Sequence, residues 1–454
     1  MTAPHPNRPS LSHLGSHWGL RSETLLALLW AGELVYLAFP SETLANALTT
    51  VLILYIGLSL VASRWQTLAL CGALLAASLA MCFAYDAWTA LWPGFQKSLI
   101  FLAFMPTAML IRSTADQRPE TAATRTLFAS LPRAGRDGGL LIGCHVIGSV
   151  LSVGIFSLLA PIAGPDAVEN DRRQLIGVGL RGMCMAALWS PFFVSMALVS
   201  EYLPDVELWR IMPAGFALAV AGLLTSYVLF DNAGGAMGLA RSVRSLAPVL
   251  PNVAVAAIVV AVVSGVSGLS TLQSLAISVP PLCALALVPL GRAKALAACR
   301  STYHGLGNVG GEIGILTFSV ILGVVFKAAL AQSGLAPDLA LLTPSAPAVI
   351  AVIIAGMCVA GFFGIHPIVS ATVLLALVAN LPHGVADLAL MMAILTGWGL
   401  AAMISISGIS VVLSSVLFQV PPERLILKQN IILVAVFGVI TIMLITLVNS
   451  VLSG

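Results

Sequence analysis

The chain has 454 residues, of which 59% are hydrophobic and only 9% are charged, and its mean hydropathy is +1.03. This composition excludes a soluble globular protein, in which about 25% of the residues carry a charge. The formal net charge of +3 comes from basic residues scattered among loops, so it does not indicate nucleic-acid binding, which needs clustered basic residues.

The apolar segments are long and do not alternate with polar residues, so they predict spanning helices and not barrel strands. In chain order they are 24–40, 43–62, 66–83, 96–112, 138–162, 174–202, 208–230, 247–267, 273–290, 310–331, 346–381, 386–418 and 429–452. The predicted fold is an all-α polytopic membrane protein with about 11–13 hydrophobic segments. Residues 1–22 are polar, and we predict that they form a disordered cytoplasmic tail.

Three of these segments are too long for one crossing. Segments 174–202, 346–381 and 386–418 have about 29, 36 and 33 residues, whereas a crossing needs about 20. Each contains proline or clustered glycine and serine near its middle. Such a segment is either a broken helix or a re-entrant hairpin, and its irregular backbone is tolerated only where it lines protein or a wet cavity.

Charged loops predict the orientation. Arginine and lysine concentrate in the loops 112–137, 231–246, 291–304 and 419–428. The positive-inside rule places these loops in the cytoplasm, with the N-terminus inside and the C-terminus outside an inner membrane. The loops at 163–171 and 201–207 are mostly acidic and are expected outside. Residues 115–133 could form an amphipathic helix on the cytoplasmic surface.

A repeated pattern divides the chain into residues 23–235 and 236–454. Gly138-Gly139, the segment 182–186 and Trp189-Ser190-Pro191 are followed, about 170 residues later, by Gly310-Gly311, the segment 356–360 and Ile365-His366-Pro367. Interrupted apolar segments at corresponding places in two halves indicate a secondary transporter with its substrate site at the interruptions. The charge rule gives both copies the same orientation, so parallel and inverted repeats both stay open.

The first interruption is Trp189-Ser190-Pro191. Proline removes a backbone hydrogen bond and frees carbonyl groups about one turn earlier. These carbonyls and the hydroxyls of Ser190 and Ser195 can coordinate Na⁺ or bind a carboxylate. A simple proline kink, with the serines bonded to their own helix, fits the same pattern. We predict Ser190, Pro191 and Ser195 as substrate-binding residues.

The second interruption is Gly364-Ile365-His366-Pro367, closely followed by Ser370 and Thr372. A buried imidazole at His366 could accept a coupling proton or bond a substrate oxygen. A structural histidine bonded to a carbonyl is the alternative. The predicted site residues here are Gly364, His366, Pro367, Ser370 and Thr372. His145 has no breaker beside it, and we interpret it as structural.

The third interruption begins with Thr396-Gly397-Trp398-Gly399 and continues through the serine-rich stretch 405–410. We predict Ser405, Ser407 and Ser410 as site residues, although small residues also permit close helix packing. Arg181 lies inside a span, with eight residues between it and Ser190-Pro191. It could attract an anionic substrate, or it could reach a lipid headgroup.

Enzymatic motifs are absent from the sequence. It contains no Walker A loop, zinc-ligand spacing, HExxH or GxSxG. The seven cysteines form no CxxC pair and are interpreted as small core residues. We therefore expect no enzyme activity, no metal site and no cofactor, with Na⁺ entering only as a coupling ion.

At its interrupted segments the chain resembles the ion transporter superfamily, which includes arsenite, citrate and divalent-anion transporters. The resemblance implies a re-entrant hairpin and a broken helix in each half, with 138–162 and 310–331 as the hairpins and 113–133 as an interfacial helix. It also implies Na⁺ and anion binding at the breaks, an elevator mechanism and a homodimer. The Ser-Asn-Thr triplet of the divalent-anion branch does not occur, which leaves proton coupling or another anion open.

The sequence thus favours a secondary active transporter, a symporter that carries a small anionic organic acid through the lipid bilayer using Na⁺ or H⁺. A passive channel would need a continuous polar pore with rings of charge or carbonyls. A membrane-embedded enzyme acting on a lipid-linked substrate would need acidic or metal-binding residues near the interface. Saturable, ion-dependent uptake separates the transporter from both.

Overall fold

The computed structural model describes residues 22–120, 136–163, 167–231, 235, 250–334, 345–379 and 383–453. Within these ranges the regular secondary structure is entirely helical. By length and composition alone, nine helical segments of the described residues could cross a membrane. The prediction of an all-α polytopic membrane protein is confirmed. The predicted tail, apart from Ser22, and most of the predicted amphipathic helix at 115–133 lie outside the described residues.

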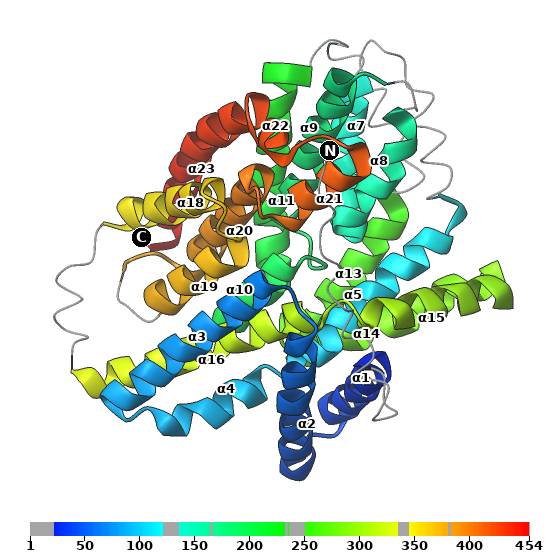
Figure 1. Ribbon diagram of the computed structural model, residues 1–454. Coiled ribbons are helices and arrows are strands. Elements are labelled where there is room, and N and C mark those ends of the chain that lie inside the picture. The colour runs from blue at the N-terminus through cyan, green and yellow to red at the C-terminus, as the bar shows by residue number, and fades with distance from the viewer. Residues whose placement is uncertain are drawn as a thin grey trace, which may run out of the picture.

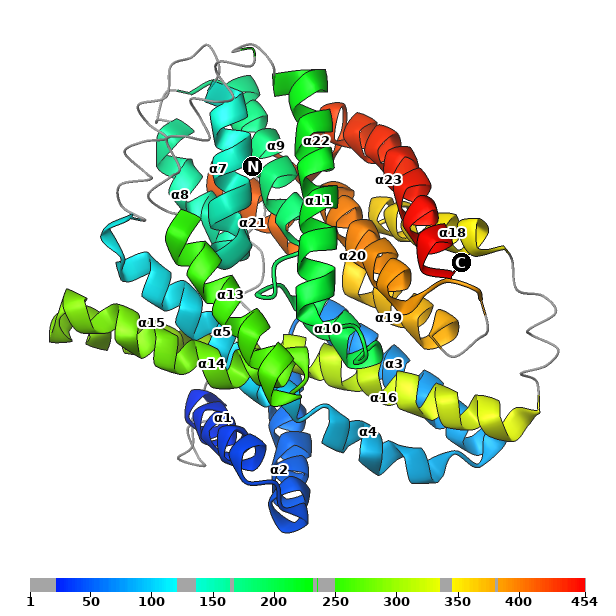
Figure 2. The ribbon, with the colours of Figure 1, turned by 180° about the vertical axis from the view of Figure 1, so that it is seen from behind.

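One group of helices, called the first bundle here, combines the beginning of the chain with a stretch after residue 270. Its members are α1 (Ser22–Ala38), α2 (Glu42–Val61), α3 (Trp65–Tyr85), α4 (Leu91–Lys97), α5 (Ile100–Gln117), α14 (Thr271–Leu287), α15 (Arg292–Leu306) and α16 (Gly310–Ser333). The two halves of the chain interlock here, because α16 packs on α3 and α5 packs on α14 and α15. Figure 1 shows the first pairing and Figure 2 the second.

The second bundle contains the interrupted segments. Its members are α7 (Arg136–Leu151), α8 (Ile155–Ala163), α9 (Glu169–Ala186), α10 (Val194–Tyr202), α11 (Leu208–Ser226) with the π-helix η5 (Tyr227–Asp231), α18 (Ala346–Phe362), α19 (Pro367–Val378), α20 (Asp387–Ile404), α21 (Ile409–Phe418), α22 (Pro422–Ile426) and α23 (Gln429–Ser453). The most extensive pairings are α7 with α9 and α18 with α20. Helix α13 (Leu250–Ser267) packs mainly on α14 of the first bundle.

Residues 136–163 form a hairpin, called the first hairpin. Near the start of α7, Asp137 accepts a hydrogen bond from Gln174 of α9 at 3.1 Å. Near its end, the Ser149 carbonyl accepts one from Ser190, beyond the end of α9, at 2.5 Å. The two helices are therefore parallel, and α8 between them must carry the chain back. With 16 and 9 residues, α7 and α8 extend about 24 and 14 Å, too short to cross about 30 Å of hydrocarbon.

Helices α18 and α19 form the second hairpin by the same geometry. Helix α18 runs parallel to α20, because Met357 packs on Gly397 and the Gly364 carbonyl accepts a hydrogen bond from Ser407. Helix α19 therefore returns. With 17 and 12 residues, α18 and α19 extend about 26 and 18 Å and do not cross a bilayer. The long segment predicted at 346–381 is thus a re-entrant hairpin.

The turn of the second hairpin depends on Gly364. Its φ is +84°, a left-handed conformation that favours glycine. The Gly364 N–H donates to the Gly361 carbonyl and the Ile365 N–H donates to the Ala360 carbonyl, both at 2.9 Å. This is the Schellman pattern that closes a helix C-terminus. Pro367 then occupies the first position of α19, where its missing N–H removes no helical bond.

The two hairpin-and-broken-helix pairs are inverted relative to each other. Arg172, near the start of α9, donates to the carbonyl of Phe418, at the end of α21. Further along, Gly399 of α20 packs so closely on α9 that an added Cβ would lie 2.8 Å from the Cys184 carbonyl oxygen. Helix α9 therefore runs antiparallel to α20 and α21. The repeat is therefore inverted, and its second copy consists of other elements than the segment after Gly310-Gly311, to which the charge rule applied.

Two expectations about the repeat are wrong. The segment 310–331 is no hairpin, because α16 is one continuous helix of 24 residues. Its paired glycines lie in the first turn, where they do not interrupt the helix. The segments 182–195 and 356–370 are also not equivalent, because the first belongs to a broken helix and the second to a hairpin.

The predicted placement of two loops on opposite sides is wrong as well. Loop 163–171 was expected outside and loop 419–428 inside, but Glu169 forms an ion pair with Arg424. The two loops therefore lie on the same face. The physical reason is the first hairpin, which begins and ends on one face, so the chain makes no crossing between residues 136 and 163.

Close packing of α7 on α9 gives a stability prediction. A Cβ added at Gly182 would overlap the carbonyl oxygen of Leu141, and a backbone atom cannot move aside easily. At Gly72 of α3 an added Cβ meets nothing within 4 Å. We expect Gly182→Ala to lower the free energy of unfolding by about 2 kcal/mol or more. Gly72→Ala should raise it by about 0.5–1 kcal/mol, since alanine favours a helix.

Thermal unfolding of the two variants in detergent, followed by tryptophan fluorescence, tests this prediction. Gly397→Ala is an informative third variant. Gly397 occupies in the second pair the position that Gly182 has in the first, but it faces the flexible side chain of Met357, which can rotate away. The melting temperature of Gly397→Ala should lie between those of Gly182→Ala and Gly72→Ala. Equal melting temperatures for Gly182→Ala and Gly72→Ala would contradict the packing of α7 on α9.

Candidate functional site: two helix breaks and two hairpin turns

The α9–α10 break comprises residues 187–193. Pro191 lies within it and has no N–H to continue a helix. Ser190 is fully buried; its hydroxyl donates to the Ser149 carbonyl of the first hairpin and accepts from the Phe192 N–H at 3.3 Å. Ser195, in the first turn of α10, donates across the break to the Ala187 carbonyl at 3.4 Å. The predicted interruption is confirmed, and its serines bind backbone carbonyls.

The α20–α21 break comprises residues 405–408. The Ser407 hydroxyl donates to the Gly364 carbonyl in the turn of the second hairpin at 2.6 Å. The hydroxyls of Ser405 and Ser407 lie 3.2 Å apart. Ser410 donates across the break to the Ala402 carbonyl at 3.1 Å. The structure thus brings Ser405, Ser407, Ser410 and Gly364 together, as four of the predicted site residues.

The two breaks have equivalent hydrogen bonds. Ser195 and Ser410 each bridge a break to the carbonyl eight residues earlier. Corresponding residues of the two pairs are 215 positions apart: Ser190 corresponds to Ser405, Ser195 to Ser410 and Ser149 to Gly364. In each pair, a serine of the broken helix also anchors the turn of the neighbouring hairpin. This equivalence replaces the one predicted between the segments around Ser190 and His366.

The remaining residues of the second predicted interruption serve the start of α19. His366 precedes that helix, and its Nδ1 accepts from the Ile368 N–H at 3.2 Å. Ser370 donates to the Pro367 carbonyl at 3.2 Å. Thr372 is fully buried and lies 3.0 Å from the Ser319 hydroxyl of α16. Thr372 therefore faces the first bundle, away from the Gly364–Ser407 contact.

The stretch Thr396-Gly397-Trp398-Gly399 does not interrupt a helix. It lies inside α20, which is continuous to Ile404. Its glycines serve close packing instead, which was the alternative interpretation. The buried Thr396 hydroxyl has no hydrogen-bond partner among the described residues. The interruption predicted over 396–410 is therefore confined to 405–408.

The contacts that support the α9–α10 break were not predicted from the sequence. The indole N–H of Trp189 donates to Nε2 of His145 at 3.2 Å. Nδ1 of the same ring lies 3.3 Å from the Gly182 carbonyl, so we assign the ring proton to Nδ1. His145 thus links α7 to α9, in agreement with its structural interpretation. Ser149 takes part through its carbonyl, which no side-chain pattern could reveal.

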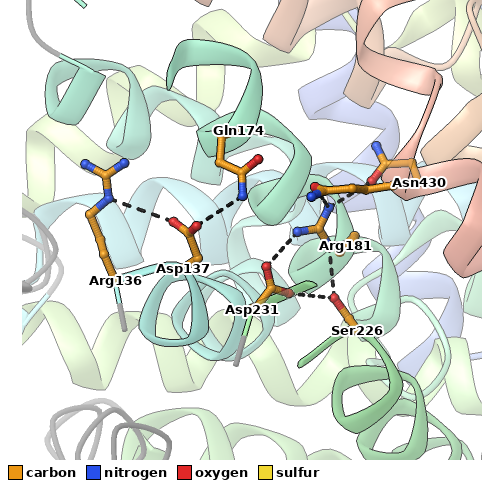
Figure 3. A network of polar contacts seen from close by, with 8 residues as sticks. Arg136, Asp137, Gln174, Arg181, Ser226, Asp231 and Asn430 are labelled. Carbon is orange, nitrogen blue, oxygen red and sulfur yellow. Dashed lines mark hydrogen bonds and ion pairs between the residues drawn. The ribbon is translucent and has the colours of Figure 1, made fainter. Parts of the chain in front are cut away.

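Arg181 is held by side chains of this chain (Figure 3). It forms an ion pair with Asp231 at 2.8 Å, and both side chains are fully buried. Its Nε donates to Ser226 at 2.9 Å, and Nη1 donates to Gln429 and Asn430 at 3.2 and 3.3 Å. The guanidinium therefore has partners for its donors. Four of its five N–H donors are thus bonded to side chains of this chain, so the predicted role as partner of an anionic substrate finds little free donor capacity here.

The arrangement presents oxygen atoms and helix N-termini at two places in the second bundle. The breaks supply hydroxyl groups and backbone carbonyls, which are the groups that coordinate Na⁺ in broken-helix transporters. Helices α10, α19 and α21 all begin at these places, and helix N-termini carry partial positive charge that favours anions. Cation and anion binding are thus both chemically accessible.

No protein-family model matches the chain, and no curated protein matches it either. The assignment of function therefore depends on the geometry of the breaks and hairpins.

Proposed function

We propose that this protein is a secondary active transporter of a small anionic organic solute. One observation supports the proposal above all others. The second bundle contains two inverted pairs, each made of a re-entrant hairpin and a broken helix. Within each pair, a serine of the broken helix donates a hydrogen bond to a carbonyl of the hairpin. Inverted repeats with broken helices are typical of secondary transporters, whose substrates and coupling ions bind at the breaks.

The proposed mechanism moves the second bundle against the first, as in an elevator. The contacts between the bundles include α10 and α19 on α16. Tyr202 of α10 donates to the Ser319 carbonyl at 2.5 Å, and Thr372 of α19 contacts the Ser319 hydroxyl. Ser319 is thus a point where both bundle faces meet. Movement of the second bundle along the first would break the hydrogen bonds of Tyr202 and Thr372 to Ser319.

The orientation proposed here combines loop charge with the corrected hairpin geometry. With loops 231–246, 291–304 and 419–428 in the cytoplasm, the first hairpin opens to the cytoplasm and the second to the outside. The N-terminus is then cytoplasmic, and the membrane is the inner membrane. Na⁺ or H⁺ supplies the driving force, and the protein holds no resident cofactor. A homodimer follows from the resemblance to elevator-type transporters.

Uptake into proteoliposomes tests this proposal. The purified protein is reconstituted, and uptake of radiolabelled mono-, di- and tricarboxylates is measured with an inward Na⁺ gradient, a pH gradient or neither. We expect saturable uptake that needs one of the gradients and stops when an ionophore collapses it. Gradient-independent, non-saturating flux would indicate a channel. Absence of carboxylate uptake, together with turnover of a lipid-linked substrate, would indicate an enzyme.

A further inference from the structure

A basic cavity opens where α9 begins and where α22 meets α23. Its volume is about 170 Å³, well above the roughly 10–15 Å³ that one water molecule needs. Among the lining residues are Arg173, Gln174, Arg181, Lys428, Gln429 and Asn430. The break serines are not among them, so the cavity is separate from the proposed substrate site. We propose that it binds the phosphate group of an anionic phospholipid.

Charge is the first argument. Three cationic side chains line the cavity and no acidic side chain does. Arg181 is neutralised by Asp231. Arg173 and Lys428 have no ion pair with any described residue, so they leave an excess of about two positive charges. Asp137, another acid that contacts a lining residue, is occupied by Gln174 at 3.1 Å and by Arg136 at 3.9 Å.

The construction of the cavity is the second argument. Gly177 lies on its wall, and a Cβ there would come 3.4 Å from Nη1 of Arg181. The buried network in Figure 3 fixes Asn430 and Arg181 at the back of the cavity. Arg173 is half-buried and Lys428 is exposed, so both can move onto a ligand. A rigid amide-lined back wall with two mobile cations in front suits a phosphate oxyanion.

The surroundings identify a lipid as the source of the phosphate. Leu427 lines the cavity and is 45% exposed. Along α23, which starts at the cavity, Ile432, Val436 and Val439 are 47%, 39% and 58% exposed. This apolar strip, one side of a spanning helix, can hold an acyl chain directly beside the headgroup. Basic pockets between membrane helices bind anionic headgroups in this way. The proposal does not depend on transport activity.

Binding of short-chain phosphatidylglycerol to the full-length protein in detergent tests the proposal, by native mass spectrometry and by thermal shift. Phosphatidylcholine, inorganic phosphate and succinate are the comparison ligands. We expect phosphatidylglycerol to bind and to raise the melting temperature, as a ligand specific for the folded state does. Phosphatidylcholine, with no net charge, should bind much more weakly.

Two substitutions remove the mobile cations. Arg173→Gln and Lys428→Asn should each weaken binding about fivefold, and the double variant about 25-fold. Asparagine suits position 428 because it tolerates the left-handed backbone there, where φ is +68°. Lys294→Asn, which removes an exposed charge from α15, should leave binding unchanged. The melting temperatures without ligand confirm that each variant is folded.

Three results would overturn the proposal. The first is equal binding of phosphatidylcholine and phosphatidylglycerol. The second is an equal loss in Lys294→Asn and in the cavity variants, which would indicate nonspecific attraction to charge. The third is binding of free phosphate or succinate that depends on Arg173 and Lys428 while phosphatidylglycerol does not bind, which would make the cavity a site for a soluble anion.

Discussion

Replacing Arg181 with methionine is expected to lower the free energy of unfolding by about 3–5 kcal/mol, because the change leaves the Asp231 carboxylate buried and unpaired. Both side chains are fully buried, and their N–O distance is 2.8 Å. The Ser226 hydroxyl, which bonds both members of the pair, would lose one of its partners. Equilibrium unfolding in mixed detergent and SDS micelles measures the change.

The double variant Arg181→Met/Asp231→Leu distinguishes the free energy contributed by the ion pair from the free energy contributed by each side chain alone. Removing both charges should cost less than the two single changes together, by about 1–3 kcal/mol. Arg424→Met is the matched control, because it breaks the exposed pair with Glu169 and should change stability by no more than about 1 kcal/mol. Additive losses in the double variant would show that Arg181 and Asp231 do not act as a pair.

Composition, segment length and helix-breaking residues were enough to predict the fold class and three of the places where the apolar segments are interrupted. Pro191, Gly364 and the serines at 405–410 all lie at or beside real helix ends, because these residues either prevent helical bonding or permit a turn. They do not reveal what the chain does afterwards. After Pro191 the chain continues forward in α10, whereas after Gly364 it turns back in α19.

The difference between the two outcomes depends on contacts with distant residues. The first hairpin is fixed by bonds from α7 to Gln174 and Ser190, and the second by bonds from its turn to Ser407. Without those contacts the sequence could not distinguish a crossing from a return at 136–163. The repeat was consequently aligned on the wrong elements, and loops 163–171 and 419–428 were placed on opposite sides of the membrane although they lie on one face.

The candidate site was predictable only where a side chain supplies the chemistry. Ser190 and Ser407 stand out in an apolar sequence, but their partners are the carbonyls of Ser149 and Gly364, and every residue has a carbonyl. Arg181 stood out as a charge inside a span. Its partner Asp231 lies at the end of the following apolar segment, 50 positions along the chain, and was interpreted as part of a loop.

Under the proposed function, Ser190→Ala and Ser407→Ala should each lower the rate of solute uptake about tenfold or more. Each removes a hydroxyl that joins a helix break to a hairpin turn. The change in stability should be only about 1 kcal/mol, the usual net contribution of one hydrogen bond. Uptake in proteoliposomes and thermal unfolding are measured on the same preparations, so that a folding defect is recognised directly.

Ser78→Ala is the matched control, because this serine of α3 is also buried but bonds the Leu74 carbonyl of its own helix. It should keep its uptake rate while losing a similar amount of stability. Because each of these serines joins a break to its neighbouring hairpin, Ser190→Ala and Ser407→Ala should impair uptake to a comparable extent. Normal uptake in both variants would remove the breaks from the transport mechanism. Loss in only one would mean that the substrate and its coupling ion use the two breaks unequally.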